Sequence, residues 1–313
     1  MELSWQREFT TFKFRLGEYS VFKLKLDTLV FDRHFSDVSL KMHEELPNLK
    51  QLISGDRVML IRSCPVDKYI PIFSFHSGYI RYVPYKYRRY YVKMSCSFEE
   101  YLKKFNSRSK STLMRKIRKF SDYCNGTIDC REYKYPAEVE EFYKHAQFVS
   151  KNTYQSRLLA CGFPEGGKTK EELARLAKAG AMRGFVLFHE TSPVAYLYSP
   201  VKDNIVYYRF VGYDTDYQRH SPGTILQFLA LQKLFSEKQF RMFDFTEGEG
   251  QHKEFFSTDV QPCADIYYFK FGLKNILIVL VHAFFDRSSR LIVKILDVFK
   301  LKSRIKKHIR ARA

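Results

Sequence analysis

The segment with the clearest chemical potential is VGYDTDYQRHSPGTILQFLALQKL, in which a polar loop joins an expected strand to an expected long helix. The helix begins at Pro222 and Gly223, and the first amides of a helix have no hydrogen-bond partner within it. These amides and the positive end of the helix dipole attract anions, and Gly223 keeps a side chain out of the way. Arg219 adds a positive charge nearby. The spacing predicts a pyrophosphate site, although Pro-Gly helix starts are common by chance.

A second group of reactive side chains lies in DFTEGEGQHK, at the end of an expected strand. The strand delivers Asp244 and Glu247 to its carboxyl end, and glycines then turn the chain sharply. Carboxylates beside His252 and Lys253 can position or deprotonate an acceptor amine. We expect Asp244 or Glu247 to be the orienting group or base, and Lys253 to hold the substrate by its charge. The alternative is an acidic loop in which Lys253 forms ordinary ion pairs.

A third polar cluster, NTYQSR, follows an expected helix and precedes a glycine-rich loop. Tyr154, Gln155 and Arg157 offer a ring, an amide and a planar cation, which together suit acceptor binding. Ordinary helix-end polarity is the alternative. The histidines are isolated and the six cysteines form no CxxC pair, so no metal site is predicted and reduced thiols are expected.

The elements that must position these residues follow a mixed α/β order. After a strand at 126–133, we expect helices at 136–150 and 169–179, strands at 184–189, 194–199 and 205–211, a helix at 223–237 and a strand at 242–245. The short turn at 190–192 predicts a hairpin. A strand, loop, helix and strand in this order build a cleft between a strand end and a helix N-terminus.

The segments before residue 125 differ from those after it in their pattern of hydrophobic and charged residues. Residues up to about 95 show strand patterns, in YSVFKLKL, RVMLIRS, YIPIFSF and YIRYVPY, with one helix expected at 32–53. Residues 98–123 predict a basic amphipathic helix, or two, that carries eight Lys and Arg. Its basic face is either an ordinary solvated surface or a rim that attracts a phosphate-bearing substrate.

The net charge of +19 over 313 residues suits nucleic acid, acidic lipid headgroups or a polyphosphate cofactor. No zinc-finger, helix-turn-helix or RNA-binding aromatic motif accompanies it. The tail from residue 273 joins an apolar run, too short to span a bilayer, to an end with seven Lys or Arg in its last fourteen residues. This pattern predicts an interfacial helix on an anionic membrane surface; a packed helix with a frayed basic end is the alternative. Without an apolar signal segment, we expect a cytoplasmic protein, peripheral on the inner membrane face.

The run 183–258 resembles the CelD-like branch of the GNAT superfamily, acetyltransferase domains associated with polysaccharide biosynthesis and related to Fem-type peptidyltransferases. The matching pieces are RGFVLFHETSPVAYLYSP, YYRFVGYDTDY, SPGTIL and FDFTEGEGQHKEFFST. The resemblance implies an α/β (α+β) GNAT fold, with a mixed, mostly antiparallel central sheet flanked by helices and a C-terminal basic amphipathic helix. We therefore expect a degenerate GNAT-like domain at 1–125, a GNAT acyltransferase domain at 126–272 and a basic tail at 273–313.

The resemblance also implies where the donor binds. The backbone that binds the pantetheine arm of acetyl-CoA, or of another acyl-CoA, falls on Phe210, Val211 and Gly212. The phosphate loop and helix start fall on Arg219, His220, Ser221, Pro222, Gly223 and Thr224. In that loop only Gly223 matches a glycine of the common GNAT pattern. The family's Asp, Gly and Lys fall on Asp244, Gly248 and Lys253.

Three hypotheses follow. The first is an acyl-CoA-dependent transferase that acts on a sugar, amino sugar, sugar nucleotide or lipid-linked glycan. The second keeps the fold but takes the acyl group from aminoacyl-tRNA, as Fem-type enzymes do; the +19 charge and helix 98–123 suit tRNA, whereas the lack of a long coiled-coil arm argues against it. The third is a non-catalytic, membrane-associated scaffold, which the reduced phosphate loop motivates.

Overall fold

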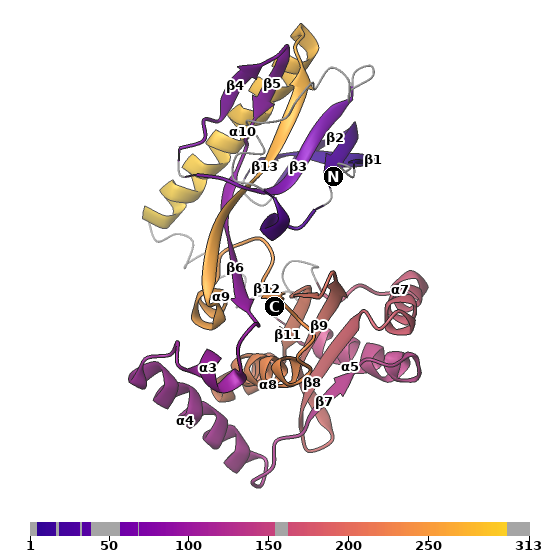
Figure 1. Cartoon of the computed structure of the whole chain (residues 1–313), viewed down its shortest axis with the longest axis vertical. Helices are drawn as coiled ribbons and strands as arrows, with labels where there is room; N and C mark the ends of the chain where they lie inside the picture. The colour runs from indigo at the N-terminus through magenta and orange to yellow at the C-terminus, as the bar shows by residue number, and fades with distance from the viewer. Residues whose placement is uncertain are drawn as a thin grey trace. The chain divides into compact units, whose positions relative to one another are not determined.

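The computed structural model describes residues 5–16, 19–31, 33–38, 57–67, 69–153 and 162–298. Its contacts divide the chain into two compact units, one of Met1–Arg88 with Gln261–Ala313 and one of Arg89–Val260 (Figure 1). This division places the basic helical segment in the second unit, whereas the sequence-based division placed it at the end of the first domain. That residues 1–125 form a GNAT-like domain stays a prediction.

The second unit is built on a mixed, mostly antiparallel sheet. Its strands lie in the order β6-β12-β10-β9-β8-β7, and β11 pairs with β9 off this path. The bounds are β6 (Lys86–Lys93), β7 (Cys130–Tyr133), β8 (Met182–His189), β9 (Ser192–Lys202), β10 (Ile205–Tyr207), β11 (Phe210–Tyr213) and β12 (Met242–Asp244). All of these pairs are antiparallel except β10 with β12, which is parallel.

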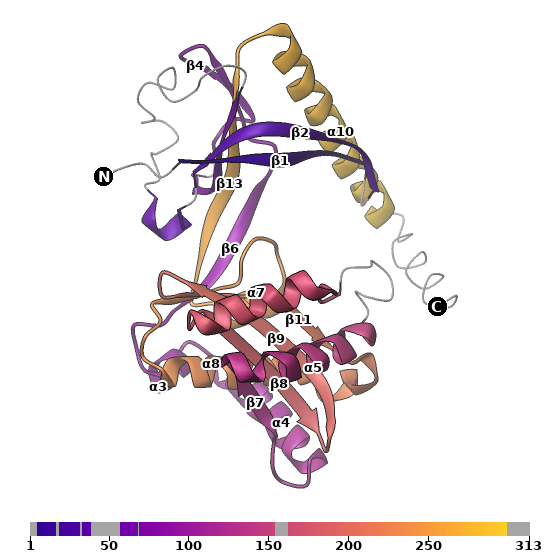
Figure 2. The ribbon, with the colours of Figure 1, turned by 90° about the vertical axis from the view of Figure 1, so that its right-hand side faces the viewer.

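Helices cover both faces of this sheet (Figure 2). One face packs against α5 (Val139–Lys151) and α7 (Gly167–Lys178). The other packs against α3 (Phe98–Leu102), α4 (Ser107–Tyr123) and α8 (Pro222–Ser236). The 3₁₀ turns η2 (Pro136–Glu138) and η3 (Thr215–His220) precede α5 and α8, and the short helix α9 (Gln251–Phe256) follows β12. Because side chains alternate across a strand, β9 directs Tyr196 toward α5 and Leu197 toward α8.

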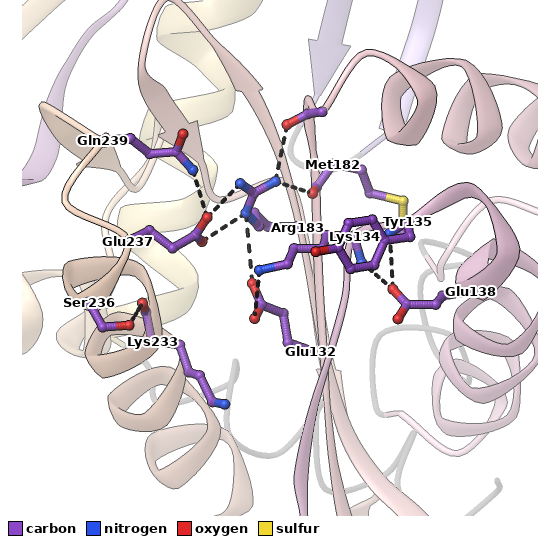
Figure 3. A network of polar contacts seen from close by, with 11 residues as sticks. Glu132, Lys134, Tyr135, Glu138, Met182, Arg183, Lys233, Ser236, Glu237 and Gln239 are labelled. Carbon is purple, nitrogen blue, oxygen red and sulfur yellow. Dashed lines mark hydrogen bonds and ion pairs between the residues drawn. The ribbon is translucent and has the colours of Figure 1, made fainter.

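A buried arginine fixes the C-terminal end of α8 to the sheet (Figure 3). Arg183 in β8 donates to both carboxylate oxygens of Glu237, over 2.9 and 2.7 Å, and lies 3.8 Å from Glu132 in β7. It also donates to the carbonyls of Gly180 and Met182. A buried guanidinium is tolerated only when its donors are satisfied in this way. The network holds the C-terminal end of α8 against β8.

The first unit contains the remaining strands. Its strands are β1 (Trp5–Leu16), β2 (Tyr19–Phe31), β3 (Val58–Pro65), β4 (Phe73–His76), β5 (Tyr79–Tyr82) and β13 (Asp259–Lys270), and η1 (Phe35–Asp37) follows β2. The order is β1-β2-β3-β13, with β5 on β13 and β4 on β5. Strands β6 and β13 contribute residues to both units. The helix expected at 32–53 falls almost wholly outside the described residues; its described part contains the 3₁₀ turn η1.

The helix α10 (Leu273–Val298) belongs to the first unit and packs through one side on β1. Val279 is buried there, and the ring of His282 stacks on Phe12 at 4.0 Å. Phe285 meets the rings of Phe14 and Phe22. Within the part of the chain that the structure describes, no helix is long and apolar enough to cross a membrane.

Most elements expected between 98 and 245 are confirmed. The turn at 190–192 joins β8 to β9 as a hairpin, and residues 98–123 form the two helices α3 and α4. The prediction of one continuous strand at 205–211 was wrong, because the strand is interrupted after Tyr207 and continues as β11 from Phe210. The expected mixed, mostly antiparallel sheet flanked by helices is confirmed.

Candidate functional site

Strands β10 and β12 lie side by side, but the chain segments that follow them separate. Their parallel pairing ends at Tyr207 opposite Asp244, and the Tyr208 amide donates to the Asp244 carbonyl over 2.9 Å. Then β12 ends, while the chain after Tyr208 continues as β11 along β9. Among the described residues, no strand pairs with the other edge of β11. That edge therefore offers backbone donors and acceptors to an extended ligand.

The separation has a local cause in a β-bulge. Val206 pairs with Val201 and Phe210 pairs with Tyr198, which is four steps along one strand and three along its partner. One extra residue is therefore accommodated between β10 and β11. A bulge bends the strand that carries it and increases its twist, and this turns β11 away from the line of β12.

Gly212, at which the family resemblance predicts binding of the donor arm, is required by the packing of its neighbours. A Cβ atom there would lie 2.6 Å from the ring of Tyr196 and 2.7 Å from the methyl group of Thr153. Thr153 follows α5, and the adjacent Asn152 donates to the carboxylate of Asp214 over 3.1 Å. The end of α5 is thus fixed against β11 and the turn after it.

The start of α8 is open in the way that the sequence predicts for an anion site. Ser221 adopts the left-handed conformation, with φ 55°, and its side chain does not cap the helix. Thr224 donates back to the Ser221 carbonyl, and Pro222 has no N–H to satisfy. A Cβ atom on Gly223 would meet only the ring of Tyr213, at an ordinary 3.4 Å. Phosphate binding by these amides and by the exposed Arg219 stays a prediction.

The basic helix α4 lies beside this helix start. Its last residue, Tyr123, stacks between His189 at 4.2 Å and His220 at 4.0 Å. Partial burial and the charges of Lys119 and His189 lower the pKa of His220, so this ring is neutral at pH 7. Five exposed bases along α4 form no ion pair with another described residue: Arg108, Lys110, Arg115, Arg118 and Lys119. The start of α8 therefore has a cationic neighbour.

Asp244 is fully buried, and both of its carboxylate oxygens are engaged. The Nε atom of Arg89 lies 3.1 and 3.0 Å from the two oxygens, and Nη2 lies 2.5 Å from Oδ2. The amide of Thr246 donates to Oδ1 over 2.8 Å. Such charge-assisted contacts stabilise the ionised carboxylate. Of the two roles that the sequence left open for Asp244, this geometry favours orientation over proton abstraction.

Lys253 closes the loop that follows β12. Its ammonium group is buried and donates to the Glu247 carbonyl over 2.7 Å. Burial lowers the pKa of Lys253, while the charges of Asp244 and Glu247 oppose the shift. The side chain of Glu247 is exposed, and the ring of His252 lies 5.7 Å from that of Tyr208. Glu247 is therefore the more accessible of the two candidate bases, and substrate binding by Lys253 stays a prediction.

The two ends of the site are separated along β11. Asp244 lies beside Tyr207, and η3 begins just after Asp214, which follows β11. Tyr213 lies six residue steps after Tyr207, and strands rise about 3.3 Å per residue, so the ends are at most about 20 Å apart. An elongated ligand is needed to occupy both ends.

Sequence reasoning missed several residues of this site. Arg89 carries no motif, and 155 positions separate it from Asp244. Tyr208 and Tyr196 were not singled out because aromatic residues in strands are ordinary core residues. The expected acceptor-binding residues Tyr154, Gln155 and Arg157 lie outside the described residues, so this expectation stays a prediction. Among the described residues no group of side chains is suited to bind a metal ion.

Residues 107–254 match the model of the family described as "Acetyltransferase (GNAT) domain". The match extends from α4 to α9 and includes β11, the start of α8 and the loop after β12. Residues 107–254 thus form a GNAT-type acetyltransferase domain, the domain of a transferase. No curated protein sequence matches the chain.

The chain is also similar to solved structures. FemX aligns with a TM-score of 0.51 at 11% identity, over 82% of this chain and 83% of its own. L-PGS from Bacillus licheniformis aligns with a TM-score of 0.47 at 13% identity, over 83% of this chain and 85% of its own. At this identity, the likeness to FemX establishes a shared fold alone.

Proposed function

We propose that the GNAT domain transfers an acyl group from an acyl-CoA to an amine or hydroxyl group of an acceptor. One observation carries the proposal: the edge of β11 that no described strand pairs with leads directly to the open start of α8. A donor bound along this path places its amide-bearing arm on Phe210, Val211 and Gly212. Its pyrophosphate then meets the amides at Gly223, while its thioester lies near the end of β12.

The reaction needs few groups from the protein. The acceptor attacks the thioester carbonyl, the C–S bond breaks, and coenzyme A leaves as the thiolate, which takes up a proton. Glu247 accepts the proton that the acceptor loses, directly or through water. Asp244, held by Arg89, orients the backbone at the end of β12. The resemblance to CelD-like domains supports a sugar, sugar nucleotide or lipid-linked glycan as acceptor. Tyr154, Gln155 and Arg157 are the residues proposed to bind it.

The second candidate donor is aminoacyl-tRNA, and α4 is the observation that favours it. The first turn of α8 and a few positive charges are enough to bind a pyrophosphate. The 17 residues of α4 extend the basic surface over about 25 Å, which is long enough to follow a nucleic-acid backbone. Because α4 packs against η3 and α8, this surface adjoins the predicted phosphate site.

Calorimetric titration with acetyl-CoA tests the first donor, with Gly223→Glu and Gly223→Ala as a matched pair. Both substitutions have room for a Cβ atom, so both variants are expected to fold. Glutamate places a negative charge where the phosphates lie and is expected to abolish binding, whereas alanine is expected to change the Kd less than about tenfold, or 1.4 kcal/mol. Equal affinity in all three proteins would remove the phosphate site from the start of α8.

Binding of aminoacyl-tRNA at graded salt separates the donors. A tRNA donor is expected to bind tightly at low salt and to weaken steeply as salt rises. A chain that binds acetyl-CoA and shows no salt-dependent tRNA binding supports the first donor. A chain that binds neither, and ignores longer acyl-CoAs, would instead be a scaffold that keeps the fold without the reaction.

A further inference from the structure

The helix α10 has two apolar sides, of which only one is covered. The covered side carries Val279 and Phe285, which pack on the first unit. The other side exposes five large apolar side chains at helical spacings of four, three, four and seven residues: Leu273, Leu277, Leu280, Phe284 and Leu291. Their exposed fractions run from 54 to 88%. We call this set the α10 stripe; residues at such spacings lie on one side of a helix.

The apolar surface continues beyond the start of the helix. Phe271, two residues before α10, is 57% exposed, and Phe75 in β4 is 72% exposed. Their ring centroids lie 5.8 Å apart. Figure 2 shows α10 along the margin of the first unit, with one side away from the sheet. A continuous exposed apolar surface of this kind marks an interaction site.

Exposed bases flank the α10 stripe, and the acidic residues of α10 are Asp286 and Asp297. Lys270, Lys274 and Arg287 are exposed beside it. The sequence has no acidic residue between Asp265 and Asp286, and its last fourteen residues hold seven Lys or Arg and no acid. Leucine and phenylalanine on one side of a helix with flanking bases is the pattern of helices that lie in the plane of an anionic bilayer surface.

A second copy of the chain fits this surface less well. A symmetric contact through the α10 stripe would set the bases of one copy beside those of the other. It would also bring together two chains that each carry a net charge of +19. An anionic lipid surface meets the same apolar side chains and neutralises the bases.

We propose that the α10 stripe, with Phe271 and Phe75, is a membrane-docking surface that inserts into the headgroup region of anionic lipid. The helix lies on the bilayer and does not span it. The flanking lysine and arginine stems lie along the apolar region and keep their charges among the headgroups. The inference is independent of the proposed acyl donor, because it uses no residue of the second unit.

Sedimentation of the full-length protein with vesicles tests the proposal. Vesicles of phosphatidylcholine alone are compared with vesicles that also contain phosphatidylglycerol, without acyl-CoA and at low and high salt. Wild type is expected to bind the anionic vesicles and to keep part of its binding at high salt, where purely electrostatic attraction is screened. Leu277→Glu with Phe284→Glu is expected to lower the partition coefficient about a hundredfold, or about tenfold for each apolar side chain kept out of the lipid.

A matched control separates the α10 stripe from general surface charge. Phe9 in β1 is 71% exposed, so Phe9→Glu makes the same chemical change as Phe284→Glu at another exposed site. It is expected to leave binding near the wild-type value. In a second readout, Phe284→Trp is expected to shift its fluorescence to the blue when anionic vesicles are added, whereas Phe9→Trp is not.

Two results would overturn the proposal. Unchanged vesicle binding by the Leu277→Glu/Phe284→Glu variant would mean that the basic tail alone attaches the chain. Concentration-dependent self-association of wild type that this variant abolishes would assign the α10 stripe to a second copy. Unchanged acetyl-CoA binding by the variant is expected in every case, so failure here is distinct from failure of the proposed function.

Discussion

Gly212 and Gly223 are glycines of the candidate site for different physical reasons. Gly212 is required by its neighbours within the protein, because Tyr196 and Thr153 occupy the space of a side chain. Gly223 has room for a Cβ atom, so packing does not explain it. A glycine that packing does not require, at an open helix start, is consistent with close approach of a ligand to the backbone.

Gly212→Ala is therefore expected to destabilise the protein by about 1–3 kcal/mol through overpacking. Gly223→Ala, the matched control, is expected to change stability by less than about 1 kcal/mol. The free energy of unfolding in urea measures both. An equal effect of the two substitutions would show that the ring of Tyr196 moves aside at little cost.

The buried pair of Asp244 and Arg89 makes another prediction at the residue scale. Asp244→Asn leaves the guanidinium without its counter-charge and is expected to cost about 3–5 kcal/mol of stability. Glu247→Gln, at an exposed site, is expected to change stability by less than about 0.5 kcal/mol and to lower the rate of acyl transfer about 10²–10⁴-fold. Denaturation and turnover are measured on both variants. A stable but inactive Asp244→Asn protein would return the role of base to Asp244.

At the scale of the element, a partly buried histidine, His282, joins α10 to the strands of the first unit. His282 stacks on Phe12, and its Nδ1 atom lies 2.7 Å from the Tyr82 hydroxyl. Burial lowers the pKa of His282 to about 4, although the backbone of Lys13 opposes the shift. The imidazole is therefore neutral in the folded protein at pH 7, and its packing against Phe12 carries no charge.

The docking of α10 is therefore expected to weaken in acid. Between pH 6.5 and about 4, the unfolded chain binds a proton at His282 that the folded chain does not. This contribution to stability is complete above pH 6.5 and is lost as the pH falls toward 4. The urea midpoint of wild type should fall across this window more steeply than that of His282→Phe, which keeps a ring on Phe12. Parallel pH profiles would contradict the assignment.

At the scale of the whole molecule, the effect of the net charge of +19 depends on where the charged side chains lie. The exposed bases of α4 adjoin the start of α8, whereas the acidic residues Glu247 and Glu249 lie in the loop after β12. A polyanion that approaches the second unit is therefore steered toward α4. The same charge also favours the anionic lipid proposed for α10.

If tRNA is the donor, Arg115→Gln with Arg118→Gln is expected to lower the slope of log K against log salt by about 2. Acetyl-CoA binding should change little, because its proposed pyrophosphate contacts are made by the amides of α8. Filter binding at graded salt and calorimetry give the two quantities. An unchanged slope would show that α4 does not contact the nucleic acid, and an equal loss of acetyl-CoA affinity would show that α4 contacts coenzyme A.

Local patterns in the sequence determined much of this protein. The alternating runs of β8 and β9, the turn between them and the Pro-Gly start of α8 are short-range signals, because hydrophobic period and turn chemistry act over a few residues. The uncapped start of α8 and the acidic loop were predictable for the same reason. So was the amphipathic character of the basic helix before residue 125.

Only the tertiary structure decided which of these residues meet. The contact of Asp244 with Arg89, the approach of Tyr196 and Thr153 to Gly212, and the division of one expected strand into β10 and β11 depend on partners far along the chain. The uncovered side of α10 likewise depends on which side the first unit buries. Pairing between distant segments is chosen by packing across the whole fold, and no local pattern of residues encodes it.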